Sequence, residues 1–131
     1  MNALDYLVLS VALYGANIVV QGVFANLKYD PKTLLGNRDD FAPEGVGLMR
    51  AKRAQANFTE AMVLFAPLVL VASATDKLGG LTDLGAAVFF WSRLAYLVSY
   101  VAGLGPVRSL VWFGGAAGTG MILWALSPFA A

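Results

Sequence analysis

Four long apolar windows constrain the fold of this 131-residue chain more than any other feature. They cover approximately residues 6–27, 54–74, 84–104 and 107–129. Each window supplies about 20 residues, enough for an α-helix to cross the hydrocarbon core of a bilayer. Charged residues make up only 13% of the chain, against about 25% in an average soluble domain. We therefore predict an all-α integral membrane protein, formed as a single four-transmembrane-helix domain over residues 1–131.

Two residue types that carry much protein chemistry are absent, because the sequence contains neither cysteine nor histidine. Their absence excludes disulfides, cysteine nucleophiles, Cys/His metal sites and a histidine general base. We predict no metal site. The net charge of +1 gives no reason to expect binding to nucleic acid. If the protein performs nucleophilic chemistry, we expect the nucleophile to come from a bound small molecule.

The connections between the windows differ in positive charge, which predicts their orientation. The first connection and the start of the second window hold Lys28, Lys32, Arg38, Arg50, Lys52 and Arg53. The second connection holds only Lys77, and the third holds Arg108. By the positive-inside rule, the first and third loops are cytoplasmic and both termini lie on the opposite side.

Polar residues inside three windows recur every three or four positions, so each predicted helix carries one polar stripe. The stripes are Ser10, Tyr14, Asn17, Gln21 and Lys28; Arg50, Arg53, Asn57 and Glu60; and Arg93, Tyr96 and Tyr100. Ionisable residues in membrane spans usually face the bundle interior or a wet cavity. Together the stripes suit a small ligand with carboxylates, an amine and amide groups. An arginine can bind a carboxylate bidentately, while Glu60 can bind an ammonium and Asn57 a peptide group.

A purely structural interpretation of these residues stays open. A polar stripe can simply hydrogen-bond one helix to another, and Arg93 can form a buried ion pair with Glu60. The spacing Gly114-xxx-Gly118 indicates a close helix contact. The fourth window has no charge after Arg108 and resembles packing material.

Two stretches resemble a known family. The segment "RAQANFTE" resembles the R-A-x-x-N-x-x-E signature of the MAPEG family, the membrane-associated proteins of eicosanoid and glutathione metabolism. The segment "RLAYLVSYVAGLGPVRS" resembles the third-helix pattern of that family's microsomal glutathione transferases and microsomal prostaglandin E synthase. The run "GNRDD" in the first loop is similar to bacterial members. The resemblance covers essentially the whole chain.

The resemblance implies a homotrimer in a bacterial inner membrane, with glutathione bound between neighbouring subunits near the cytoplasmic side. Arg53, Asn57 and Glu60 match the family's glutathione-binding positions in its second helix. Tyr96 and Tyr100 match the aromatic and tyrosine positions of its third helix, and we include Tyr96 in the glutathione-binding set. Arg108 matches the arginine that stabilises the thiolate, through an alignment one residue shorter in the corner before it. We assign Arg108 and Tyr100 to catalysis, and we add Arg93 and Gln21, from the polar stripes, to the glutathione-binding set. Met49 departs from the family pattern, since eicosanoid-making members have a glutamate there.

The expected activity is that of a glutathione-dependent transferase or peroxidase, in which the thiolate attacks a lipophilic electrophile or hydroperoxide that enters from the membrane lipid. An alternative is a non-catalytic lipid-binding or scaffold protein of the same fold. A third is a small channel or transporter subunit, which ion flux in liposomes would reveal.

We predict that single cysteines introduced at Lys32 and Lys77 will react with a membrane-impermeant thiol reagent from opposite sides of the membrane. The chain has no native cysteine, so each label reports one position. Labelling of both positions from the same side would contradict the predicted orientation.

Overall fold

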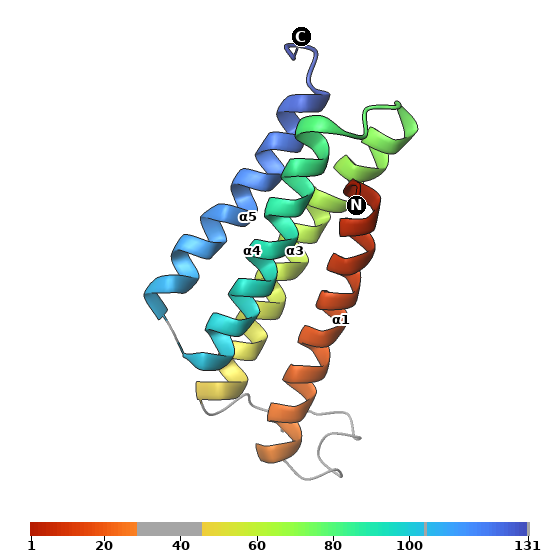
Figure 1. The fold of residues 1–131 in the computed structure, drawn as a ribbon. Coiled ribbons are helices and arrows are strands. Elements are labelled where there is room, and N and C mark those ends of the chain that lie inside the picture. Colours follow the sequence, from red (N-terminus) through yellow and green to blue (C-terminus); the bar gives the residue numbers. More distant parts are fainter. Residues whose placement is uncertain (29–45, 104, 131) are drawn as a thin grey trace.

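Four helices lie side by side as a bundle in the computed structural model of the chain (Figure 1). They are α1 (Ala3–Lys28), α3 (Val46–Ala74), α4 (Gly80–Ala102) and α5 (Gly105–Leu126). The structure describes residues 1–28, 46–103 and 105–130, without the side chains of 24–28, 46–48, 50–51, 101 and 105–108. Each helix contains a stretch long and apolar enough to cross a membrane: Ala3–Val23, Lys52–Ala74, Gly80–Tyr100 and Ser109–Leu126. The four-helix, all-α part of the predicted fold is therefore confirmed.

The helices begin earlier than the apolar windows indicated. The helix α3 begins at Val46 rather than near residue 54, and α4 begins at Gly80 rather than near residue 84. The early part of α3 is polar but rich in good helix formers, namely Leu, Met, Arg, Lys and Ala. Hydropathy therefore located where the chain can cross the bilayer, and not where the helix begins.

Side-chain contacts at its N-terminus tie α1 to α4. The Asn2 side-chain oxygen accepts a hydrogen bond from the Leu4 N–H at 2.9 Å, as expected of a helix cap. The Ala3 N–H donates to a carboxylate oxygen of Asp83, in the first turn of α4, at 2.8 Å. These two helices therefore begin at the same end of the bundle and run parallel to each other (Figure 1).

Aromatic side chains fill the centre of the bundle. The rings of Phe65 from α3 and Phe89 from α4 stack with centroids 3.9 Å apart, and both residues are fully buried. The Tyr14 ring of α1 meets Phe58 of α3 edge to face at 5.4 Å. This core is narrow, because only 17–28% of each membrane-crossing stretch is buried within the chain.

Glycines allow α4 and α5 to pack at very close range. A Cβ atom added to Gly118 would lie 2.5 Å from the Gly85 carbonyl oxygen and 2.7 Å from the Phe89 backbone nitrogen. A Cβ at Gly114 would lie 2.5 Å from the Ser92 hydroxyl oxygen. The close helix contact predicted from Gly114-xxx-Gly118 is confirmed, and its partner is α4 of the same chain.

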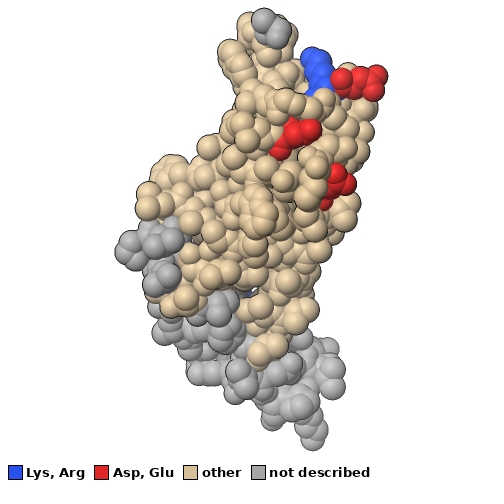
Figure 2. Space-filling model, in the orientation of Figure 1, with Lys and Arg blue, Asp and Glu red and all other residues tan. Residues whose placement is uncertain are grey.

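Charged side chains on the face shown in Figure 2 gather at one end of the molecule. This end carries the N-terminus and the turn between α3 and α4, where Asp5, Asp76, Lys77 and Asp83 lie. The long middle part of this face carries no coloured side chain, as expected for a surface in contact with lipid. The side of the membrane on which this end lies stays a prediction.

We predict that Gly118→Ala will destabilise the protein by roughly 1–3 kcal/mol, because the added methyl group overpacks the contact with α4. Gly120→Ala on the same helix is the matched control, since nothing lies within 4 Å of the place that its added methyl group would take. Thermal unfolding of both variants in mild detergent tests the contact. Equal unfolding temperatures for the two variants would argue against close packing at Gly118.

Candidate functional site

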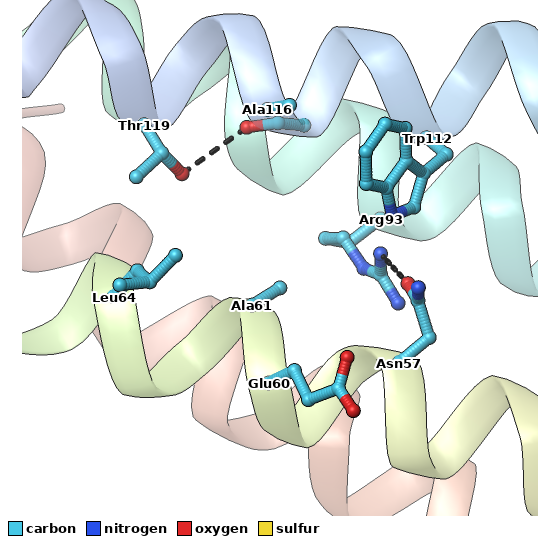
Figure 3. Close-up of a pocket in the computed structure, with 9 residues that line it drawn as sticks. Asn57, Glu60, Ala61, Leu64, Arg93, Trp112, Ala116 and Thr119 are labelled. Atoms are coloured by element: carbon cyan, nitrogen blue, oxygen red, sulfur yellow. Dashed lines mark hydrogen bonds between the residues drawn. The ribbon is translucent and has the colours of Figure 1, made fainter.

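A cavity of about 230 Å³ lies between α3, α4 and α5 (Figure 3). Its walls consist of Asn57, Glu60, Ala61, Leu64, Arg93, Trp112, Gly115, Ala116 and Thr119. The polar part of the wall comes from α3 and α4, whereas α5 supplies mostly apolar and small residues. A polar group bound here would therefore be oriented by α3 and α4.

The most buried charge of the site is the guanidinium of Arg93, a residue that is only 2% exposed. Its Nη1 donates a hydrogen bond of 2.7 Å to Oδ1 of Asn57. The guanidinium carbon lies 4.6 Å from the ring centroids of both Phe58 and Tyr96, at the distance of a cation–π contact. The remaining nitrogens, Nε and Nη2, are buried and have no hydrogen-bond partner within the described residues.

This cavity lies at bilayer depth. Arg93 precedes Tyr100, where the membrane-crossing stretch of α4 ends, by a helical distance of about 10 Å. Asn57 and Glu60 lie inside the stretch Lys52–Ala74 of α3. Ionisable residues at such depth are costly and usually mark a functional site or a wet cavity.

The cavity walls follow from one helical spacing used twice. On α3, the lining residues Asn57, Glu60, Ala61 and Leu64 occupy positions i, i+3, i+4 and i+7. On α5, Trp112, Gly115, Ala116 and Thr119 occupy the same four positions. Residues with this spacing share one helix face. The small side chains in the middle of the α5 set leave the space that the cavity occupies.

The contribution of α5 was missed by the sequence analysis, which treated the fourth window as packing material. Apolar residues that line a cavity look the same in sequence as apolar residues that pack. The available signal was the pair of small residues, Gly115 and Ala116, one turn after Trp112.

The structure brings three of the predicted site residues together at the cavity: Asn57, Glu60 and Arg93. Tyr96 adjoins them through its ring contact with Arg93. Tyr100 lies outside the cavity wall, buried against Ala54 in a second cluster.

Of the three other predicted site residues, two lie outside the cavity wall, and the side chain of the third lies outside the described residues. Arg53 is exposed on α3, one turn before Asn57, and Gln21 is half-buried on α1. Arg108 belongs to the first turn of α5, and its side chain lies outside the described residues. The binding and catalytic roles of the predicted residues stay predictions.

The possible ion pair between Arg93 and Glu60 is not formed. Arg93 bonds to the Asn57 amide instead, and within the described residues the Glu60 carboxylate has no hydrogen-bond or ion-pair partner. Glu60 is exposed, whereas Arg93 is buried. In Figure 3 the Glu60 carboxylate lies on the same side of the cavity as the Asn57 amide.

On α1, a structural use of the polar stripe is observed at Tyr14. Its hydroxyl group and the Thr59 hydroxyl group of α3 are 2.7 Å apart and share a hydrogen bond. Ser10 and Asn17 of the same stripe are buried. This part of the stripe therefore joins α1 to the bundle, as the structural interpretation expected.

Comparison with known proteins gives one match. The sequence model of the MAPEG family matches residues 6–127, nearly the whole chain. No curated protein and no solved structure matches it.

We predict that Asn57→Leu will destabilise the protein by at least about 1–3 kcal/mol, because it leaves the buried Arg93 cation without its hydrogen-bond acceptor. Removing both partners, in Asn57→Leu with Arg93→Leu, should restore much of that loss, since no buried charge is left unpaired. Thermal unfolding in detergent compares the two. A double variant less stable than Asn57→Leu alone would contradict this account of the contact.

Proposed function

Because the chain belongs to the MAPEG family, we propose that it is a membrane-embedded glutathione-dependent transferase or peroxidase. This family is generally associated with glutathione and includes glutathione transferases. The observation that carries the proposal is the meeting of Asn57, Glu60 and Arg93 at one cavity inside an otherwise apolar bundle. These residues lie in the segments "RAQANFTE" and "RLAYLVSY", which carry the family resemblance.

The free polar groups at the cavity suit glutathione, which has two carboxylates, one ammonium and two peptide groups. The Nδ2 group of Asn57 donates to no group in the described part of the chain, so it is available to an oxygen of a ligand. The Glu60 carboxylate is likewise available to an ammonium. Arg53, exposed one turn away, is our candidate for bidentate binding of a carboxylate. Tyr96 and Gln21 complete the proposed set.

The cavity of one chain is smaller than the proposed ligand requires. Its volume of about 230 Å³ falls below the range of about 300–1,000 Å³ that is usual for small-molecule pockets. We propose that a neighbouring copy in a homotrimer supplies the missing wall. The outward surface for such contacts exists, because most of each membrane-crossing stretch is not buried within the chain.

The chemistry that bound glutathione supplies is a thiol nucleophile. A free thiol has a pKa near 8.5, so only a small fraction is ionised at neutral pH. A neighbouring cation favours the ionised form. We propose that Arg108 has this role and that the Tyr100 hydroxyl group assists as a hydrogen-bond donor. The backbone N–H groups in the first turn of α5, which begins at Gly105, also favour negative charge nearby.

The second substrate in this proposal is a lipophilic electrophile or hydroperoxide that enters from the bilayer. Leu64 and Trp112 line the cavity and are also 63% and 42% exposed. An apolar molecule in the membrane can therefore contact the cavity wall directly. We further propose that the first and third loops face the cytoplasm and that the protein resides in a bacterial inner membrane.

The same apolar, exposed wall also supports the alternative of a non-catalytic lipid-binding or scaffold protein. Its Ala61, Leu64 and Ala116 side chains would suit an acyl chain as well as a substrate. Thiolate formation separates the two functions, because a lipid-binding protein has no need to ionise a thiol.

We predict that the wild-type protein in detergent will bind glutathione and show thiolate absorbance in the ultraviolet at neutral pH. Arg108→Ala should still bind glutathione. The thiolate fraction and the rate should fall by about tenfold for each unit by which the pKa of the glutathione thiol rises. Both should recover in part at higher pH, where the thiol ionises without help. Tyr100→Phe should combine non-additively with Arg108→Ala if both act on the same sulfur atom. Bound glutathione without a thiolate signal at any accessible pH would favour the lipid-binding alternative.

A further inference from the structure

Within the described residues, Arg93 makes one hydrogen bond through its guanidinium group, to Asn57. Nη1 is engaged by Asn57, while Nε and Nη2 are buried. The two aromatic rings, of Phe58 and Tyr96, each lie 4.6 Å from the guanidinium carbon. The guanidinium is therefore held between Asn57 and the two rings, in the wall of the cavity.

An arginine determines whether the oxygen or the nitrogen of a neighbouring side-chain amide faces it. The guanidinium group has five N–H donors and no acceptor. The asparagine side chain has an oxygen that accepts and a nitrogen that donates, and only the oxygen can meet Arg93. The orientation of the Asn57 amide consequently follows from the chemistry of its partner. Its second group, Nδ2, has no partner among the described residues.

We infer that Arg93 is a positioning residue that sets the polarity of the site by fixing the Asn57 amide with its N–H donors available to the ligand. The ligand group that meets Asn57 is then a hydrogen-bond acceptor, such as a carbonyl or carboxylate oxygen. A peptide N–H does not suit the place opposite Nδ2, because it would face another donor there. In this role Arg93 acts on the ligand through Asn57.

This polarity contrasts with that of Glu60, one helical turn along the same cavity wall. The ionised Glu60 carboxylate can only accept hydrogen bonds. The wall of α3 therefore presents a donor at Asn57 and an acceptor at Glu60. A suitable ligand presents the reverse order, an oxygen followed by an ammonium or N–H group, and this order restricts how it can lie in the cavity.

The assignment of glutathione as that ligand rests on the proposed function, but the positioning role of Arg93 does not. The decisive variant is Asn57→Asp, which keeps the shape of the side chain. One carboxylate oxygen can still accept from Arg93, so the fold is retained. The other oxygen replaces the Nδ2 donor, so the cavity now meets the ligand with an acceptor.

We expect Asn57→Asp to unfold at or above the wild-type temperature and to bind glutathione about tenfold or more weakly, the usual effect of losing a hydrogen bond to a charged group. Thr75→Asp is the matched control, because it adds the same charge in the turn after α3, at the other end of the helix. It should leave glutathione affinity unchanged. Wild-type affinity in Asn57→Asp would overturn the inference.

A second measurement tests the role of Arg93 without glutathione. In an Arg93→Gln background, Asn57→Asp should lower the unfolding temperature sharply, because its carboxylate has lost the cation. In an Arg93→Lys background it should be tolerated, since lysine is also a donor only. Equal tolerance of Asn57→Asp in all backgrounds would overturn the inference. If the wild-type protein binds no glutathione, the proposed function fails and this comparison alone decides the role of Arg93.

Discussion

The burial of one positive charge at bilayer depth constrains the whole inner side of this bundle. The hydrocarbon core offers no water, so the Arg93 guanidinium depends on partners within the protein. Asn57 supplies a hydrogen bond, and Phe58 and Tyr96 supply aromatic faces. Because Asn57 faces Arg93, the residues three, four and seven positions later on α3 share its helix face, where Glu60 and Leu64 are also exposed. These positions form the α3 wall of the cavity.

A second contact, between glycines, determines where the cavity can exist. Near Gly85 and Gly118 the backbones of α4 and α5 approach so closely that no side chain fits between them. At the level of Arg93, α5 places Gly115, and a Cβ atom added there would lie 3.6 Å from the Arg93 Cδ atom. The small residues Gly115 and Ala116 leave a space there, between the larger Arg93 and Trp112 side chains that also line the cavity. The cavity is therefore a product of side-chain size along α4 and α5.

Much of this arrangement could be predicted from the sequence, because membrane spans and polar stripes are repeating signals. Hydropathy identified the four spans, and the helical period placed Asn57 and Glu60 on one face. The pairing of Arg93 was not predictable in this way. Opposite charge favours Glu60 as its partner, but the choice depends on which side chain is buried, and sequence does not report burial of single residues. The cavity wall on α5 was missed because its residues are apolar whether they pack or line a space.

The narrow core has a consequence for how such a sequence changes over evolutionary time. Only 17–28% of each membrane-crossing stretch is buried within the chain. Toward lipid, one apolar side chain is nearly as good as another, because lipid tails are as apolar as leucine. Substitutions among apolar residues should therefore accumulate on the helix faces that contact lipid, where hydrophobicity persists and residue identity does not. In a soluble protein a hydrophobic core of constant residues contrasts with a polar surface of variable residues. Here both regions are hydrophobic, and only the inner one requires particular residues.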